Sequence, residues 1–196
     1  MIITLTGPRS VGKTSVSKLV AKALKLKYVS SDEIGEKAFK KYGGLDKVIK
    51  TGKIKEIIKK GGYNLILREY KKDNFVFDLS GGSFSSRSMS KASKEIRKTA
   101  KNKSTIIGLL PSKNIIYSVF VLFNREKKRK HFKSENKIKL FFKTLRKYPY
   151  LKKVLNQHAN FILYTKGKSP EEVAQEIVEK INQKPPLSLI FKNRKL

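Results

Sequence analysis

The feature that most constrains the fold is a glycine-containing loop near the amino terminus, Gly7-Pro8-Arg9-Ser10-Val11-Gly12-Lys13-Thr14. Before it stands a short β-branched run, Ile2-Ile3-Thr4-Leu5, and after it, from Thr14 to Lys25, apolar residues recur with helical spacing. In a strand, loop and helix of this kind, backbone N–H groups and the positive end of the helix surround phosphate oxygens. The sequence therefore predicts a P-loop that binds the phosphates of a nucleoside triphosphate.

Several positions in and near this loop have expected roles. We expect Lys13 to contact the β- and γ-phosphates and to act in catalysis, and the Thr14 hydroxyl to bind Mg²⁺. Asp78, which closes the apolar run at 75–77, is expected to be a second metal ligand. An aspartate at a strand end that caps the next loop is an equally good interpretation of Asp78. The residues predicted to bind the nucleotide phosphates are Gly7, Pro8, Arg9, Ser10, Val11, Gly12, Lys13, Thr14 and Ser15.

The rest of the chain alternates between strand-like and helix-like segments. Strand candidates lie at 2–5, 27–29, 74–79, 104–110, 115–123 and 160–165, and helices are expected at 14–25, 31–41, 45–60 and from 169 onward. This alternation predicts a three-layer α/β fold, in which helices cover both faces of a central parallel sheet of about five strands. We expect one domain at 1–184, with a substrate-side insert at about 40–70 and a basic lid at about 124–150, and then a basic tail at 185–196.

The charge of the chain is strongly positive. It has 46 Lys and Arg against 15 Asp and Glu, a formal net charge of +31. Such a field attracts polyanions, so a nucleic-acid partner is possible. The same excess of lysine also fits the codon usage of an AT-rich genome, and the charge says little about the fold.

The residues and segments that the sequence lacks limit the kind of metal site and the cellular location that we expect. The sequence has no cysteine and only two isolated histidines, His131 and His158, so we expect any metal to be bound by oxygen. No apolar run reaches the roughly 18 residues that cross a bilayer, and the first residues do not have the pattern of a signal peptide. We therefore expect a cytoplasmic protein without a membrane span, and a monomer.

Four segments of the chain form a recognisable series: the loop at 7–14, Val29-Ser30-Ser31-Asp32-Glu33-Ile34, Leu79-Ser80-Gly81-Gly82-Ser83, and the segment from Ala159 through Lys166-Gly167-Lys168-Ser169-Pro170 to Val173. In this order they resemble the shikimate kinase family, a nucleoside monophosphate kinase-like group of P-loop enzymes. The resemblance implies an ATP-dependent kinase that moves the γ-phosphoryl group of ATP to an alcohol of a small-molecule acceptor, with Mg²⁺. It places Asp32 close to the accepting hydroxyl as a catalytic residue and Gly81 and Gly82 against the substrate. Pro170 and the loop at 166–169 would lie beside adenine.

The resemblance also implies roles for several arginines. Arg68 and Arg146 correspond to the arginines that bind the substrate carboxylate in that family. The basic stretch around Arg125 and Arg129 corresponds to the lid over ATP, and we expect Arg129 to neutralise charge on the transferring phosphoryl group.

The sequence departs from the family pattern mainly on the acceptor and metal side. Ser30 stands where the family has a metal-side aspartate, Ser83 replaces a glycine, and the lid lacks an Arg-Pro pair. Two alternatives to a small-molecule kinase therefore stay open. One is a nucleic-acid-associated P-loop protein, including a nucleoside or polynucleotide kinase, and the other is an inactive nucleotide-binding module.

Overall fold

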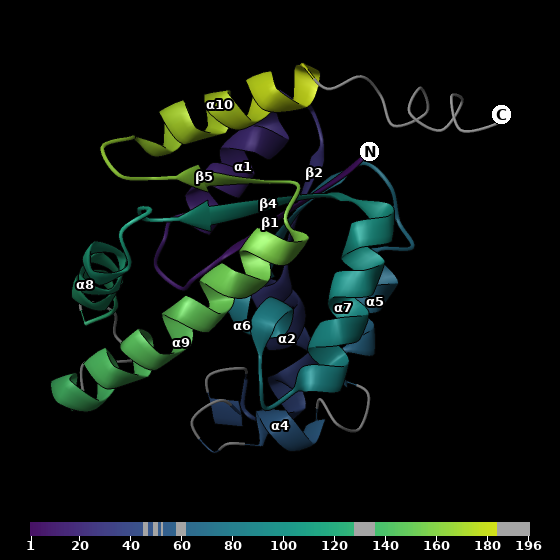
Figure 1. The fold of residues 1–196 in the computed structure, drawn as a ribbon. Helices are drawn as coiled ribbons and strands as arrows, with labels where there is room; N and C mark the ends of the chain where they lie inside the picture. Colours follow the sequence, from purple (N-terminus) through teal and green to yellow (C-terminus); the bar gives the residue numbers. More distant parts are fainter. Residues whose placement is uncertain (45–46, 49–50, 52, 58–61, 128–135, 184–196) are drawn as a thin grey trace, which may run out of the picture.

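The computed structural model describes residues 1–44, 47–48, 51, 53–57, 62–127 and 136–183 of the chain (Figure 1). Its centre is a sheet of five strands in the order β2-β3-β1-β4-β5, and every neighbouring pair is parallel. The strands are β1 (Ile2–Gly7), β2 (Lys27–Ser30), β3 (Phe75–Ser80), β4 (Thr105–Leu110) and β5 (Phe161–Tyr164). The predicted parallel sheet of about five strands is therefore confirmed.

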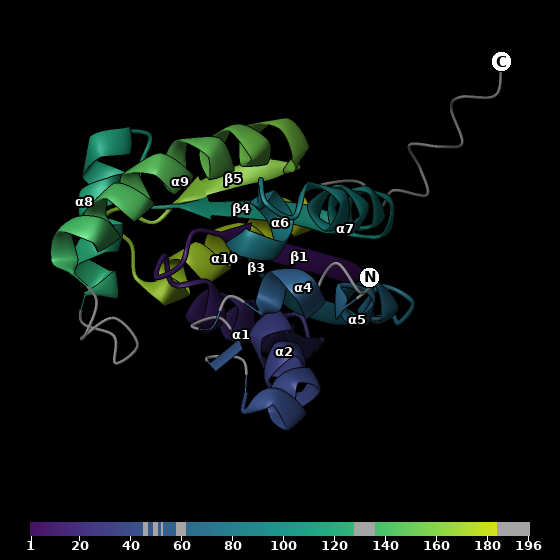
Figure 2. The ribbon, with the colours of Figure 1, turned by 90° about the horizontal axis from the view of Figure 1, so that it is seen from below.

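Helices cover both faces of this sheet, as the three-layer prediction requires. Helices α1 and α10 pack together on one face, while α7 and α9 lie on the opposite face (Figures 1 and 2). The helices are α1 (Lys13–Ala23), α2 (Ser31–Phe39), the 3-10 turn η1 (Lys40–Tyr42), α4 (Ile54–Ile57), α5 (Asn64–Glu69), α6 (Gly81–Ser85), α7 (Ser90–Lys103), α8 (Ile115–Glu126), α9 (Lys137–His158) and α10 (Pro170–Asn182).

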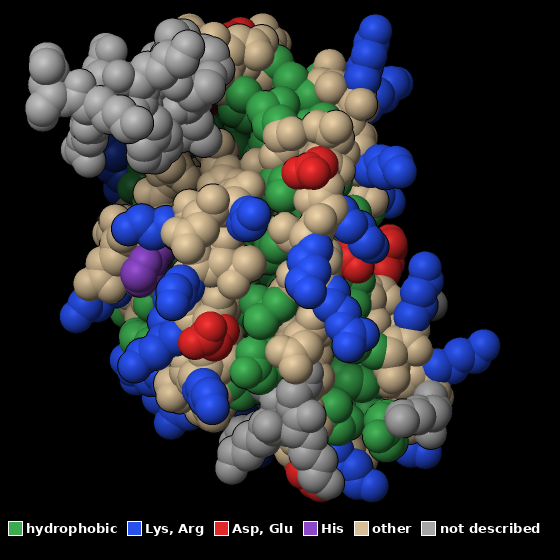
Figure 3. All heavy atoms as spheres, turned by 90° about the vertical axis from the view of Figure 1, so that its right-hand side faces the viewer, with side chains coloured by type: hydrophobic (Ala, Val, Ile, Leu, Met, Phe, Trp, Pro, Cys, Tyr) green, Lys and Arg blue, Asp and Glu red, His purple; other side chains and the backbone are tan. Residues whose placement is uncertain are grey.

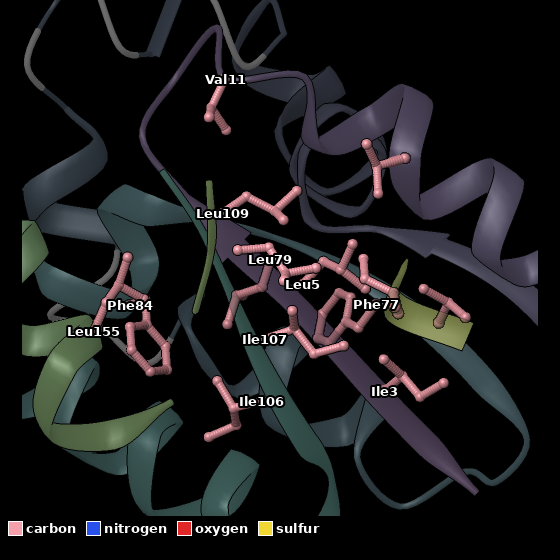
Figure 4. Close-up of a cluster of buried hydrophobic side chains, with 14 of the residues drawn as sticks. Ile3, Leu5, Val11, Phe77, Leu79, Phe84, Ile106, Ile107, Leu109 and Leu155 are labelled. Carbon is pink, nitrogen blue, oxygen red and sulfur yellow. The ribbon is translucent and has the colours of Figure 1, made fainter. Parts of the chain in front are cut away.

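The core lies between these layers because the central strands are mostly apolar and are buried along nearly their whole length. All six residues of β1 are buried, and side chains of β1, β3 and β4 such as Leu5, Phe77 and Ile107 meet in one cluster (Figure 4). A strand covered by helices on both faces has no solvent side, which explains the continuous apolar runs in the sequence. This packing holds the carboxyl ends of the strands in place.

One predicted strand is wrong: residues 115–123 belong to helix α8. Asn114 caps this helix, because its side chain accepts a hydrogen bond of 2.9 Å from the backbone N–H of Tyr117. Ser118, Val119 and Leu122 form the buried face, whereas Ile116 is 79% exposed. A continuous apolar run fits a buried strand and a helix equally well, and here the asparagine cap selects the helix.

Two predicted regions lie partly or wholly outside the described residues. In the helix expected at 45–60, the structure describes the short helix α4 and a few separate residues. In the predicted lid at about 124–150, it describes the end of α8 and the first part of α9, and residues 128–135 lie outside the described residues. The predicted basic tail at 185–196 also lies outside them. None of the helices in the described part of the chain has both the length and the apolar character that a bilayer crossing requires.

Candidate active site

The loop between β1 and α1 has the backbone geometry of a phosphate cradle. Gly12, the N-cap of α1, has φ +103°, a left-handed conformation that side chains rarely adopt. At the other end of the loop, a Cβ on Gly7 would lie 2.3 Å from the carbonyl oxygen of Leu109, so β1 and β4 approach too closely for any side chain there. Lys13 Nζ donates to the Pro8 carbonyl oxygen at 3.1 Å and therefore lies at the mouth of the loop.

This loop forms one wall of a cavity of about 350 Å³ at the carboxyl ends of β1, β2 and β3. Ligands of open parallel sheets bind at this edge. Of the predicted site residues, the cavity brings together the following: Arg9, Ser10, Gly12, Lys13, Thr14, Ser15, Asp32, Asp78, Gly81 and Gly82. Gly7, Pro8 and Val11 are buried behind this wall and shape the loop from within.

Thr14 and Asp78 meet at the base of the cavity, although 64 positions separate them in the sequence. Thr14 Oγ1 donates to Asp78 Oδ2 at 2.7 Å, and Asp78 is only 6% exposed. A hydroxyl can donate one hydrogen bond and has two lone pairs. A threonine that donates its hydrogen bond to a carboxylate therefore keeps its lone pairs for a cation.

This pair fits Mg²⁺, which prefers few protein ligands together with phosphate oxygens and water. Within the described residues there is no cluster of three or more His, Cys, Asp or Glu that could hold a metal by itself. A metal at Thr14 and Asp78 would therefore be shared with the phosphates of a nucleotide in the loop.

Tyr28 also reaches this carboxylate, a contact that no sequence pattern predicts. Its hydroxyl donates to Asp78 Oδ2 at 3.3 Å. Burial and the nearby negative charge of Asp78 raise the pKa of Tyr28 to about 12, so the phenol keeps its proton and acts as a donor at neutral pH.

The acceptor side of the cavity begins where β2 passes into α2. Ser30 caps α2, since its Oγ accepts from the N–H groups of Asp32 at 3.2 Å and Glu33 at 3.4 Å. Asp32 is exposed in the first turn and lines the cavity, where the helix dipole favours its negative charge. Ser31 Oγ accepts from the N–H of Ser80 at 2.9 Å and so ties α2 to the end of β3.

Gly81 and Gly82 open helix α6 directly after β3, but they have different surroundings. A Cβ on Gly81 would lie 2.4 Å from the Gly7 carbonyl oxygen, so glycine lets α6 press against the phosphate loop. A Cβ on Gly82 would meet nothing within 4 Å. Gly81 is therefore a packing position, and Gly82 is open to the cavity.

The remaining predicted residues are not brought to this cavity. Arg68 on α5 and Arg146 on α9 are both exposed and do not line it. From α5 the cavity is lined instead by Leu65 and Ile66. Arg129 lies outside the described residues.

A second, smaller cavity of about 200 Å³ lies beside the phosphate loop. Lys166, Gly167 and Lys168 line it from the loop predicted to contact adenine, with Tyr117, Arg125 and others from the opposite side. Pro170, the first residue of α10, does not line it. Arg125 Nη1 donates to the Ser10 carbonyl oxygen at 3.2 Å, which connects this cavity to the phosphate loop.

Together, the parallel sheet, the phosphate loop and the Thr14–Asp78 pair define a P-loop phosphotransferase. Comparison with known proteins specifies the class further. The family model described as shikimate kinase matches residues 9–182. A curated "Shikimate kinase" from Thermodesulfovibrio yellowstonii is 30% identical over 193 residues, which cover 90% of this chain and 92% of that protein. The chain therefore belongs to the shikimate kinase family.

Solved structures support the fold. A shikimate kinase from Acinetobacter baumannii in complex with shikimate has a TM-score of 0.63 at 21% identity, covering 94% of this chain and 95% of that one. The Aquifex aeolicus shikimate kinase has a TM-score of 0.64 at 22% identity, with coverage of 93% and 96%. A deoxyadenosine kinase from M. mycoides shares the fold at a TM-score of 0.59 and 14% identity, covering 94% of this chain and 100% of that one.

Membership of this family confirms the predicted class of activity. The chain is an ATP-dependent small-molecule kinase that phosphorylates an alcohol group, and ATP and Mg²⁺ are its cofactors.

Proposed function

We propose that this kinase transfers the γ-phosphoryl group of ATP to a hydroxyl of shikimate or of a closely similar alcohol. The observation that carries the proposal is the single cavity that holds Lys13, Asp78 and Asp32. One wall of this cavity suits nucleotide phosphates and the facing wall carries a carboxylate suited to an acceptor hydroxyl. A phosphoryl donor and an alcohol bound there would meet between the two walls.

In the proposed reaction, the acceptor oxygen forms a bond to the γ-phosphorus as the bond to the β–γ bridging oxygen breaks, and ADP leaves. Lys13 stabilises negative charge on the β- and γ-phosphates, and Asp32 accepts the proton of the acceptor hydroxyl. Thr14 and Asp78 would hold Mg²⁺, which neutralises phosphate charge when bound. Gly82 leaves room for the acceptor beside α6.

The arginine assignments rest on the family resemblance. We propose that Arg68 and Arg146 serve an acceptor carboxylate, and Arg129 the transferring phosphoryl group. Both Arg68 and Arg146 are exposed and lie outside the cavity wall, whereas Asp32 lines it. In the same way, we propose that Pro170 and the loop at 166–169 flank the adenine.

An ADP-release assay with Mg²⁺ and a panel of acceptors tests the proposal. The panel contains shikimate, its neutral methyl ester, nucleosides and a short oligonucleotide. We expect shikimate to accelerate ADP release, and we expect Lys13→Ala and Asp32→Asn to abolish the acceleration. The matched controls Lys22→Ala, on the same helix as Lys13, and Glu33→Gln, next to Asp32, should retain it because neither residue lines the cavity.

Three outcomes would contradict parts of the proposal. Preference for the methyl ester would show that no arginine binds an acceptor carboxylate. Acceleration by the oligonucleotide alone would favour a polynucleotide substrate. The panel includes an oligonucleotide because Lys and Arg side chains, which attract nucleic acid, are spread over most of the face in Figure 3. Full activity of Asp32→Asn would remove the proposed base.

We also propose that the enzyme is a cytoplasmic monomer. Its need for ATP supports a cytoplasmic location. The monomer needs a test because α8 and α9 expose large apolar side chains, which could bind a second copy. These side chains include Ile116, Phe120, Ile138 and Phe142. Light scattering of the protein as it elutes from a sizing column measures the mass of the species in solution. A mass of twice 22.4 kDa would refute the monomer.

A further inference from the structure

The carboxylate of Asp78 has two donors on one oxygen. Thr14 Oγ1 donates to Oδ2 at 2.7 Å from helix α1, and the Tyr28 hydroxyl donates to the same oxygen at 3.3 Å from strand β2. Two donors that approach one oxygen from different elements restrain the rotation of the carboxylate. Tyr28 therefore influences an atom of the proposed metal site without lining the cavity itself.

The strand register explains how Tyr28 reaches this position. In the β2–β3 pair, Ser30 lies opposite Asp78 and Tyr28 lies opposite Val76. Residues two apart on a strand share a face, so the long tyrosine side chain can extend along the strand to the carboxylate. Lys18 of α1 lies over the ring from the helix side, with its Nζ 5.4 Å from the ring centroid.

The residue that lies directly opposite Asp78 has a different task. The Ser30 hydroxyl accepts the two N–H groups that begin α2, and it has no charge to offer a metal. Asp78 thus has no carboxylate partner on the neighbouring position of β2. The side chain of β2 that donates to the Asp78 carboxylate is the phenol of Tyr28.

From this arrangement we propose that Tyr28 is a positioning residue for the magnesium site. Its hydroxyl holds the Asp78 carboxylate in the orientation that accepts the hydrogen bond from Thr14, and this leaves the lone pairs of the Thr14 hydroxyl directed toward the cation. The proposal rests on the assignment of Thr14 and Asp78 to the metal and is independent of the acceptor. Groups that orient a metal ligand typically change metal affinity 10- to 100-fold when they are removed.

The test compares how strongly Mg²⁺ tightens the binding of a non-hydrolysable ATP analogue. Titration calorimetry gives the analogue's Kd with saturating Mg²⁺ and with EDTA, and the ratio of the two measures the coupling between metal and nucleotide. For Tyr28→Phe, which removes only the hydroxyl, we expect this ratio to fall about tenfold. The Kd in EDTA should change less than about twofold, because the phosphate loop is intact.

Two further variants separate the possible results. Tyr70→Phe is the matched control: its buried hydroxyl bonds Thr4 Oγ1 at 3.0 Å in the core, so its loss should lower stability and leave the ratio unchanged. Asp78→Asn should abolish the coupling. If Asp78→Asn loses the coupling and Tyr28→Phe keeps it, the role of Tyr28 is refuted and the metal assignment stands. If Asp78→Asn keeps the coupling, the metal assignment fails, and the role of Tyr28 fails with it.

Discussion

Replacing Gly81 by alanine tests whether α6 really presses against the phosphate loop. The added Cβ would lie 2.4 Å from the Gly7 carbonyl oxygen, about 1 Å short of the 3.4 Å at which ordinary contact begins. The oxygen cannot retreat easily, because Gly7 is itself in close approach to the backbone of Leu109. Either α6 or the loop must therefore shift.

The expected cost follows from measured overpacking, which destabilises cores by about 1–3 kcal/mol. For a domain of this length, about 1 kcal/mol lowers the Tm by roughly 2–4 °C, so Gly81→Ala should unfold about 2–12 °C below the wild type. The adjacent Gly82→Ala is the matched control. Its Cβ meets nothing within 4 Å, and alanine is favoured over glycine in a helix by up to about 1 kcal/mol.

Calorimetric unfolding of the two variants and the wild type measures this difference. We expect a lower Tm for Gly81→Ala, and an equal or higher Tm for Gly82→Ala. Gly82→Ala should instead raise the KM for the acceptor, because its methyl group enters the cavity. If Gly81→Ala unfolds at or above the Tm of the wild type, the close approach of α6 to Gly7 is refuted.

Three further predictions concern charge and capping around the site. Ser30→Asp keeps a good N-cap and adds a carboxylate opposite Asp78, so its Tm in EDTA should be lower than that of the wild type, and Mg²⁺ with nucleotide should raise its Tm by more than it raises that of the wild type. Ser30→Asn, a neutral cap, should match the wild type in both comparisons, and equal behaviour of the two variants would show that the added charge has no effect. Arg125→Ala should raise the KM for ATP several-fold and leave that of the acceptor unchanged in steady-state kinetics, because Arg125 bonds the Ser10 carbonyl; an unchanged KM for ATP would refute this. Burial and the cations of α7 lower the pKa of His158 below its usual 6.5, so the unfolded chain binds this proton more readily and stability is lost as pH falls below about 6.5. His158→Gln should lose less Tm than the wild type between pH 7.5 and 5, and identical losses would exclude the effect.

The strand, loop and helix on the nucleotide side could be predicted from the sequence because their signals are local. The position of Gly12 in the loop is fixed by a left-handed turn, and the helix that follows has regular apolar spacing. Thr14 and Asp78 could be paired over a long stretch of sequence for a general reason: parallel strands end at the same edge of a sheet. The structure joins these two residues by a hydrogen bond.

The helices that the sequence left unassigned or misassigned have weak or ambiguous patterns. Helix α7, Ser90–Lys103, was given no element, and its buried face consists of Ala92, Ser93, Ile96 and Ala100. Three of these four residues are small, so their spacing hardly registers as an apolar stripe. In α8 the opposite problem holds: residues 115–123 are all apolar except Ser118, so a strand period and a helix period both fit.

The acceptor side was harder because it depends on which face of a short helix points inward. Arg68 stands one turn from Leu65 in α5, a helix of six residues, and the sequence alone does not tell which of them lines the cavity. Tyr63 from the insert at 40–70 and Phe39 at the end of α2 also line the cavity, and they come together only in the folded chain. Long-range contacts of this kind leave no local pattern.

On the metal side, the serine at position 30 changes what the neighbouring residues must do. The sequence identified Ser30 as a departure from the family, and the structure shows that Ser30 caps α2. Ser30 caps helix α2 and has no charge, so it does not supply a second carboxylate to the metal site. The orientation of the Asp78 carboxylate therefore becomes more important. That orientation comes from Thr14 in the loop and Tyr28 on the adjacent strand, so the proposed magnesium site depends on a hydrogen-bond network spread over three elements.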